Sequence, residues 1–254
     1  MKKLASFLLN KIPRPMLINL SIFLRPLIYQ FFKGNNFTDP IDGKSYRKFL
    51  PYGYGKQREN ALSPGTLSLE RHRQMWLFLQ NETDFFTKNY KVLHIAPEQE
   101  FLRKFKKMKN LNYTSADLFS PIVDVKADIL DLPFGDETFD IVICNHVLEH
   151  IEDDRKAMSE LYRVMKKGGW GILQVPMKNS LEKTYEDFTI TDPKERQKHF
   201  GQYDHVRWYG MDYFDRLKSV GFDAEANFYS QKFSDADIKK FALNRNEILP
   251  VVRK

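Results

Sequence analysis

The 254-residue sequence contains a single cysteine, Cys144. One thiol excludes a disulfide framework and any zinc site built from several cysteines, and it is typical of a reducing compartment. We therefore expect a cytoplasmic protein. The hydrophobic content of 42% is that of a chain that buries a sizeable core, so extensive disorder is not expected.

Acidic residues are missing from the start of the chain, where Asp39 is the first. Residues 1–90 contain 14 Lys and Arg against 6 Asp and Glu, a balance of +8, which leaves −1 for residues 91–254 out of the net +7. Basic residues alternate with apolar runs through residues 1–36. Such a basic amphipathic segment attracts phosphate groups, either of anionic lipid or of nucleic acid.

Long apolar runs are lacking too, because Pro13, Pro15, Arg25 and Pro26 interrupt them. A membrane span needs about 20 mostly apolar residues, and the segment has no small-residue cleavage site typical of a signal peptide. Two alternatives remain. A pair of short amphipathic helices could lie at the inner face of an anionic membrane, or the same helices could pack on the protein's own body or on a partner chain.

Three segments follow from the pattern of residues. After residues 1–36, residues 37–90 form an extension that is rich in turn residues and then helical, with an apolar stripe in "SLERHRQMWLFLQ". Residues 91–254 alternate between strands and helices, which predicts a parallel sheet covered on both faces. We expect strands near 91–95, 111–116, 123–127, 139–144, 170–175, 223–229 and 247–253. We expect helices near 98–109, 153–166, 209–219 and 235–242.

Glycine is absent from "KVLHIAPEQEF", residues 91–101. The stretch otherwise reads as a strand that enters a turn and then a helix, which is where a nucleotide-type cofactor meets the backbone. The segments that follow are "YTSADL" and "DILDLPFGDETFDIVICNHVLEHIEDDRKAMSELYRVMKKGGWGILQVP". Together, over about 91–230, they resemble the class I S-adenosylmethionine-dependent methyltransferases, in particular the methyltransferase-11 group that includes quinone-biosynthesis enzymes.

The resemblance implies a Rossmann-like α/β fold: a seven-stranded, mostly parallel sheet with helices on both faces, here with an N-terminal helical and turn-rich extension. It implies S-adenosylmethionine as the cofactor. The methionine carboxylate would meet the start of the 98–109 helix, Asp117 would accept from the ribose hydroxyls, and Asp128 with the Ile129 amide would contact the adenine. The implied cofactor-binding residues are His94, Ala96, Pro97, Glu98, Asp117, Leu118, Asp128, Ile129, Asn145, His146 and His150.

The first loop departs from the family pattern, in which an acid and glycines stand at the positions of His94, Ala96 and Glu98. Alanine still permits close approach, and Pro97 can fix the turn. Glu98 would repel the methionine carboxylate, so we expect it either to bond the methionine ammonium or to point away as a first-turn helix acid.

"HVLEH" places His146, Glu149 and His150 near one another at the end of the fourth strand. A divalent metal is conceivable there, as in some relatives. The expectation we favour is that these side chains orient the cofactor and the loop by hydrogen bonds, and no metal is predicted.

The polar and aromatic segment 177–210 follows the fifth strand, where long loops tend to be functional. Within "HFGQYDHVRWYG" we predict His205 as a general base, with Asp204 and Tyr203 as its catalytic neighbours. The alternative is a helix entry in which Asp204 caps and His205 binds backbone groups.

A second resemblance concerns "DPIDG" and "SPGTLSLERHR". They resemble the paired cysteine segments of a zinc knuckle that precedes some methyltransferases of this group, with Asp39, Asp42, Ser63 and Thr66 at the cysteine positions. That set is poor for zinc, so the resemblance implies a metal-free remnant.

The function expected from these features is methyl transfer to a small-molecule or lipid-linked metabolite, in contact with an anionic membrane. A nucleic-acid methyltransferase is the first alternative, but "CNHVLEH" is unlike the Asn/Asp-Pro-Pro-aromatic motif of amino-group enzymes. A binding protein that keeps the fold without catalysis is the second. The oligomeric state and the methyl acceptor are left open.

Overall fold

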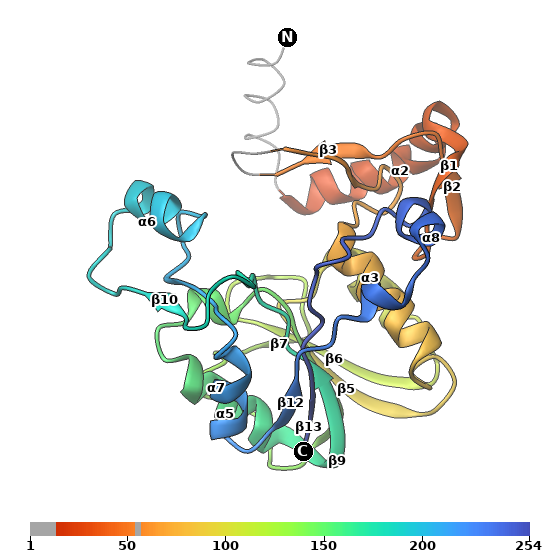
Figure 1. Ribbon diagram of the computed structural model, residues 1–254. Helices are drawn as coiled ribbons and strands as arrows, with labels where there is room; N and C mark the ends of the chain where they lie inside the picture. Colours follow the sequence, from red (N-terminus) through yellow and green to blue (C-terminus); the bar gives the residue numbers. More distant parts are fainter. Residues whose placement is uncertain (1–13, 54–56) are drawn as a thin grey trace. The chain divides into compact units, whose positions relative to one another are not determined.

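The computed structural model describes residues 14–53 and 57–254, and the side chains of residues 14–22 are outside the description. The chain forms two compact units (Figure 1). The first contains the residues up to Arg73 together with 235–243, and the second contains 74–234 and 244–254. This division differs from the segment boundaries expected at residues 36 and 90, because helix α3 (Glu70–Asn81) contributes to both units.

The first unit is small and built from local pairings. Its elements are α2 (Arg14–Phe32), β1 (Lys33–Asp39), β2 (Lys44–Tyr46), β3 (Leu50–Tyr52), β4 (Arg58–Leu62), the first turn of α3 and α8 (Asp235–Lys240). Strand β1 pairs antiparallel with β2, and β3 pairs antiparallel with β4. The buried guanidinium of Arg73 donates to the carbonyl oxygens of Ser68, Ala61, Phe241 and Ala242, so one side chain joins three segments of this unit.

Helix α2 lies within the expected helical N-terminal segment. Residues 14–32 form one continuous helix that accommodates Pro26, and the earlier helix of the expected pair falls on residues outside the description. Within the described ranges, no helix is long and apolar enough to cross a membrane.

The second unit (Figure 1) holds the predicted seven-stranded sheet. Its strand order is β12-β13-β9-β8-β5-β6-β7. Neighbours from β9 to β7 are parallel, whereas β13 runs antiparallel to both β9 and β12. The strands are β5 (Tyr90–Ile95), β6 (Leu111–Asp117), β7 (Val125–Lys126), β8 (Phe139–Cys144), β9 (Met165–Ile172), β12 (Asp223–Glu225) and β13 (Val251–Arg253). The expected mostly parallel sheet is confirmed.

Helices cover both faces of this sheet, as predicted. The helical elements are α4 (Gln99–Phe105), η1 (Leu148–His150), α5 (Asp154–Val164), α6 (Pro193–Phe200), α7 (Tyr213–Ser219) and η2 (Tyr229–Lys232). Apolar residues of α5 and α7 form one continuous core with alternate residues of β5 and β8. On the other face, the ring of Trp76 stacks with those of Phe101 and Phe105 of α4. Successive residues of "VLHI" therefore face opposite sides of the sheet, and each side packs in its own hydrophobic core.

Several predicted boundaries were wrong by a few residues. The strand expected at 170–175 starts earlier, since a bulge spreads β9: Met165 pairs with Phe139, while Trp170 pairs with Ile141. The helix expected at 209–219 begins at Tyr213, and the strand expected at 223–229 ends at Glu225. The short hairpin of β10 (Tyr185–Glu186) and β11 (Arg207–Trp208), and the helix α6 that it encloses, were not predicted.

Candidate functional site

The carboxyl ends of β5, β6 and β8 meet at one edge of the sheet, because the three strands are parallel neighbours. The chain leaves β5 through Ala96, whose φ of 46° is in the left-handed region that usually favours glycine. Its amide donates to the carbonyl of Ala116 on β6 at 2.8 Å. Pro97 follows, and helix α4 begins after Glu98. The loop thus adopts a glycine-type turn without a glycine.

Glu98 is held in place by one side chain of β5 and one from the residue that follows β8. Its Oε2 lies 3.0 Å from Nε2 of His94, and its Oε1 accepts from the amide nitrogen of Asn145 at 3.1 Å. The hydroxyl of Tyr113 lies 2.9 Å from the other ring nitrogen of His94. Burial raises the pKa of Tyr113, and the charges of Glu98 and Asp124 raise it further. His94, Glu98 and Asn145, predicted separately, therefore form one hydrogen-bonded group.

Asp117 stands at the end of β6, as predicted, and is partly exposed. Its Oδ1 accepts from the amides of Phe119 and Ser120 at 2.7 and 2.6 Å, which fixes the turn after the strand. Leu118 and Phe119 are 38% and 87% exposed at that turn. This leaves a carboxylate that can accept from ribose hydroxyls beside an apolar surface that suits an attached base.

Asp128 and Ile129 lie beyond β7. The Oδ1 of Asp128 accepts from the Leu130 amide at 2.9 Å, and Ile129 is buried in the sheet's core. The carboxylate therefore shapes its own turn.

The chain leaves β8 through Asn145 and His146, and His146 has a φ of 55°. Its amide donates to the carbonyl of Gln174 at 2.7 Å. This sharp turn starts the 3₁₀ helix η1, which carries Glu149 and His150. The ring Nδ1 of His146 lies 3.1 Å from Oε1 of Glu149.

Glu149, His150 and His205 converge beside this turn. Oε1 of Glu149 lies 4.0 Å from Nε2 of His150 and 3.9 Å from Nε2 of His205. The two imidazole rings meet edge to face with centroids 4.7 Å apart. Glu149 and His205 are buried, whereas His150 is half-buried. The sequence placed His150 with the cofactor and His205 with the acceptor; the structure brings them together.

Burial and neighbouring charges set the pKa values in this cluster. Burial acts to raise the pKa of Glu149, but the hydrogen bond and positive charge of His146 and the charges of His150 and His205 outweigh it, so the pKa is lowered. Burial lowers the pKa of His205, against the opposing effect of Glu149. An ionised Glu149 beside a neutral His205 follows near neutral pH.

The predicted neighbours of His205 lie elsewhere. Nδ1 of His205 lies 3.2 Å from the carbonyl oxygen of Phe200. Asp204 faces His150 instead, with its Oδ2 3.5 Å and its backbone oxygen 3.2 Å from Nδ1 of that ring. Tyr203 is 62% exposed. Adjacent residues in an irregular segment point in different directions, so nearness in sequence was a poor guide to side-chain pairing here.

Arg207 connects the two segments that form the cluster. Its buried guanidinium donates to the carbonyl oxygens of Leu148, Ile151 and Glu152 at 2.9, 2.5 and 2.8 Å. The Val206 amide donates to the carbonyl of Glu149 at 3.0 Å. The segment that carries His205 is therefore fastened directly to η1.

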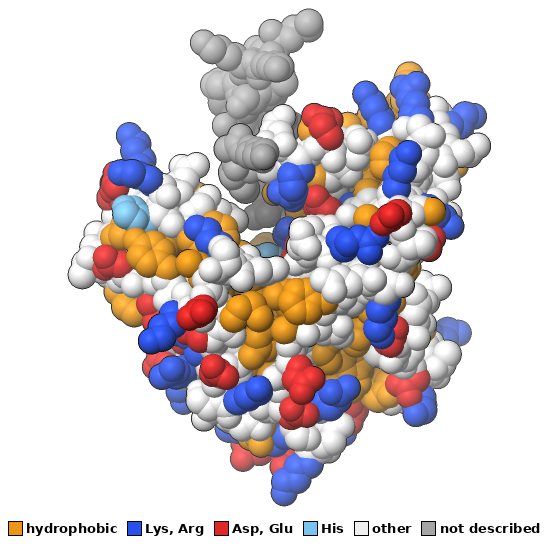
Figure 2. Space-filling model, in the orientation of Figure 1, with side chains coloured by type: hydrophobic (Ala, Val, Ile, Leu, Met, Phe, Trp, Pro, Cys, Tyr) orange, Lys and Arg blue, Asp and Glu red, His pale blue; other side chains and the backbone are white. Residues whose placement is uncertain are grey.

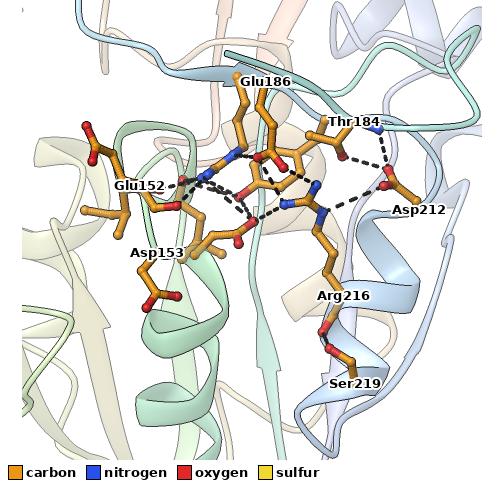
Figure 3. A network of polar contacts seen from close by, with 12 residues as sticks. Glu152, Asp153, Thr184, Glu186, Asp212, Arg216 and Ser219 are labelled. Atoms are coloured by element: carbon orange, nitrogen blue, oxygen red, sulfur yellow. Dashed lines mark hydrogen bonds and ion pairs between the residues drawn. The ribbon is translucent and has the colours of Figure 1, made fainter. Parts of the chain in front are cut away.

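A second layer of ion pairs, which includes the labelled Glu186, Arg216 and Asp212 in Figure 3, supports Arg207. Glu186 accepts from Nε of Arg207 at 2.8 Å and from Arg216 of α7 at 2.7 Å. Arg216 also donates to Asp154 at 3.0 Å, while Asp212 accepts from the amide and hydroxyl of Thr184. The β10–β11 hairpin is thereby tied to α5 and α7. Sequence reasoning missed this network, since its members are spread over 60 residues; the arginine in "HVRWYG" was the available signal.

Residues 78–173 match the methyltransferase-11 family model, which describes a methyltransferase domain. An uncharacterized protein of Methanocaldococcus jannaschii is 34% identical over 106 residues, which cover 41% of this chain and 41% of that protein. A ubiquinone/menaquinone biosynthesis C-methyltransferase of Haemophilus ducreyi is 37% identical over 81 residues, covering 32% and 26%. The aligned regions thus span less than half of the length of these curated relatives.

Among solved structures, an S-adenosylmethionine-dependent methyltransferase from Mesorhizobium loti aligns with a TM-score of 0.49 at 13% identity, over 71% of this chain and 98% of that one.

The residues that match the family model begin at 78, so the zinc-knuckle resemblance of residues 37–70 finds no support in that match. Asp39 there accepts from the hydroxyls of Thr66 and Ser68. Residues 78–173, which include β5 to β9 of the seven-stranded sheet, are thus similar to a methyltransferase domain, and the sheet has the fold of the S-adenosylmethionine-dependent methyltransferases, whose cofactor is S-adenosylmethionine.

Proposed function

We propose that this protein methylates a small-molecule or lipid-linked metabolite that is presented at an anionic membrane surface on the cytoplasmic side. The observation that carries the proposal is the convergence of Glu149, His150 and His205 next to the loops that follow β5 and β8. Such a group of mostly buried polar side chains suits a compact acceptor that is drawn out of water.

In this proposal, different residues at the sheet edge bind different groups of the cofactor. The Oδ2 of Asp117 accepts from the ribose hydroxyls, while its Oδ1 keeps the turn in place. Glu98, oriented by His94 and Asn145, faces the methionine ammonium. The carboxylate of Glu98 would repel the methionine carboxylate but attracts the methionine ammonium group. Pairing Glu98 with the ammonium group therefore removes the charge conflict in the first loop.

Bound S-adenosylmethionine supplies an electrophilic methyl group on a sulfonium. The chain's own contribution is to position the acceptor and to exclude water. His205 is the proposed base for an oxygen or nitrogen acceptor, since its lowered pKa leaves the ring neutral and able to accept a proton. Arg207 and the Val206 amide hold His205 against η1 and so fix the base in position.

Contact with a membrane is supported by an apolar stripe on α2. Phe23, Leu27 and Phe31 are 82%, 56% and 64% exposed, and their spacing of four residues puts them along one side of the helix. Arg25 and Lys33 flank the stripe. Apolar side chains with adjacent cations are the pattern of a helix that lies in a lipid interface.

Nucleic acid is a less suitable partner. On the face shown in Figure 2, Lys and Arg side chains are interspersed with Asp and Glu over most of the described surface. Nucleic-acid binding needs a continuous basic surface and does not need exposed phenylalanine and leucine on a helix.

Calorimetry with S-adenosylhomocysteine tests the proposal. The full chain should bind this product, and Asp117→Asn should weaken binding by about 1.5–3 kcal/mol, the scale of a lost hydrogen bond to a charged group. Asparagine keeps the Oδ1 acceptor that holds the turn, so the loss reports on the ligand. Asp215→Ala, an exposed acid on α7, is the control. If the unaltered protein gives no binding heat with S-adenosylhomocysteine, the methyltransferase proposal is wrong. The alternative of a binding protein that keeps the fold without catalysis would then hold.

The acceptor is addressed by a separate measurement. Untargeted lipid and metabolite profiling of a deletion strain should show accumulation of one compound and loss of its methylated form. If only tRNA or rRNA methylation changed, the acceptor would be a nucleic acid.

A further inference from the structure

We propose that Glu149, His150 and His205 form a binding site for one divalent transition-metal ion, with Zn²⁺ or Mn²⁺ as the chemical class. One ligand atom from each residue lies within 4.8 Å of the others. This metal site is a proposal separate from methyl transfer. Metal binding can be measured in the absence of the cofactor and of the methyl acceptor. It also differs from our expectation that these side chains only orient the loop.

Two polar atoms in the cluster have no hydrogen-bond partner although they are buried. They are Oε2 of Glu149 and Nε2 of His205, and the two residues are 0% and 2% exposed. A buried carboxylate oxygen or imidazole nitrogen without a partner costs free energy that a bound cation would recover.

The tautomers of both imidazoles follow from their other nitrogens. Nδ1 of His205 lies 3.2 Å from the Phe200 carbonyl oxygen, which only accepts, so this nitrogen carries the hydrogen. Nδ1 of His150 lies 3.2 Å from the carbonyl oxygen of Asp204, which has the same consequence. Both Nε2 atoms therefore present a lone pair towards Glu149.

Three acceptors face one another in this arrangement. The distances from Oε1 of Glu149 to the two Nε2 atoms, 4.0 and 3.9 Å, are too long for hydrogen bonds. Two ligands of a tetrahedral zinc ion lie about 3.4 Å apart, since each is about 2.1 Å from the metal. The two carboxylate–imidazole distances would each shorten by roughly half an ångström in such a site, and the widest separation of the three ligand atoms, which lie within 4.8 Å of one another, by up to about 1.4 Å.

The surroundings resemble the outer sphere of known metal sites. Asp204 lies behind the ring of His150, with Oδ2 at 3.5 Å from Nδ1, which is the carboxylate–histidine–metal pattern. His146 at 3.1 Å can donate to Oε1 of Glu149 and orient the carboxylate. Two neutral imidazoles and one carboxylate carry a charge of −1, and this ligand set suits zinc, manganese or iron(II) while leaving a coordination position open.

Metal binding and proton abstraction by His205 exclude each other, because both use the lone pair of Nε2. With an ion bound, the cation would lower the pKa of an acceptor hydroxyl, and the proton would be released to solvent water because His205 is then a ligand. A negative metal titration would leave the base role of His205 intact, and a positive one would confine that role to the metal-free protein; cofactor binding, tested with Asp117→Asn, is affected by neither result.

The test is a titration of the full chain, stripped with a chelator and dialysed, with Zn²⁺ and with Mn²⁺ in separate calorimetric experiments. We expect one saturable site, and a rise in melting temperature on metal addition. Glu149→Gln and His205→Gln should each weaken binding at least 100-fold, and His199→Gln, at a half-exposed histidine outside the cluster, should leave it unchanged.

Folding is checked by comparing the metal-free melting temperatures. Glutamine has nearly the same shape as Glu149, so this variant keeps the test valid if His205→Gln fails to fold. The site is disproved if the unaltered protein shows no saturable binding of either ion, or if Glu149→Gln binds as tightly as the unaltered protein does.

Discussion

Oε1 of Glu149 lies 3.9 Å from Nε2 of His205, although 56 positions separate the two residues in the sequence. The first residue comes from the turn after a central strand and the second from the segment that precedes β11. Arg207 holds these segments together through three carbonyl oxygens around η1. The geometry of the candidate site therefore depends on a residue whose side chain contacts neither the carboxylate nor the imidazole among the described interactions.

Arg207→Gln should lower the free energy of unfolding by about 3–5 kcal/mol, the usual cost of removing one partner from a buried ion pair. The change removes the Arg207 donor from Glu186 and from three carbonyl oxygens of the η1 segment, while Arg216 still donates to Glu186 and Asp154. Chemical denaturation at pH 7 measures it. Arg155→Gln, at an exposed position of α5, should stay within about 0.5 kcal/mol of the unaltered protein. Equal stability of the two variants would mean that the network in Figure 3 contributes little.

Ala96→Gly should raise the free energy of unfolding by about 0.5–1 kcal/mol. The φ of 46° at Ala96 strains a residue that has a Cβ, and relief of that strain exceeds the entropy cost of glycine. Ala157→Gly, within helix α5, should do the opposite and lower stability by about 1 kcal/mol or more. The two variants are compared by thermal and urea denaturation. A loss of stability in Ala96→Gly would show that the left-handed turn is unstrained.

Most of the fold could be predicted from the sequence, because it follows from local pattern. Strands β5, β6 and β8 were expected within a residue or two, since buried apolar runs such as "FDIVIC" have few alternatives. The extent of the short edge strands was not. Strands were expected near 223–229 and 247–253, but β12 and β13 have three residues each, because β12 is defined by its pairing with β13 and β13 by its pairing with β9.

The site was predictable in parts only. His94, Asn145 and His150 could be placed at strand ends by the spacing of motifs, but their partners could not. Asp204 was expected beside His205 because the two are adjacent in sequence, whereas its carboxylate lies 3.5 Å from the ring of His150. Side-chain direction in an irregular segment is set by tertiary contacts such as those of Arg207, which no local pattern records.

Acid should weaken the anchoring of the β10–β11 hairpin. Burial acts to raise the pKa of Glu186, but hydrogen bonds from Arg216 and Arg207 outweigh it and hold the pKa below its usual 4.5. A lowered folded-state pKa contributes stability that is complete above the unfolded-state pKa and is lost as the pH falls through the folded-state pKa.

Glu186→Gln should therefore be less stable than the unaltered protein by about 1–3 kcal/mol at pH 7, and the difference should shrink steadily below about pH 4.5. Urea denaturation at a series of pH values gives both curves. Glu225→Gln, an exposed change on β12, should run parallel to the unaltered protein throughout. A pH-independent difference for Glu186→Gln would mean that its charge is irrelevant to the hairpin.

The exposed stripe on α2 should bind anionic vesicles by two separable contributions. Phe23, Leu27 and Phe31 supply apolar area that salt does not screen, whereas Arg25 and Lys33 supply attraction that weakens as the ionic strength rises. In co-sedimentation with vesicles of mixed neutral and anionic lipid, the full chain should keep a salt-resistant fraction. Replacement of the three apolar residues by serine should reduce that fraction, while Arg25→Gln with Lys33→Gln should reduce the salt-sensitive part.

Lys194→Gln with Lys218→Gln, two exposed lysines of the second unit, controls for net charge and should bind as the unaltered protein does. These substitutions on α2 change exposed side chains and leave Tyr29, whose ring packs edge to face on Tyr46, in place. They are therefore milder than deleting residues 1–33, which would remove that contact. If the serine variant pellets with vesicles as fully as the unaltered chain at high salt, the stripe is not a lipid contact, and α2 serves the protein's own body or a partner chain instead.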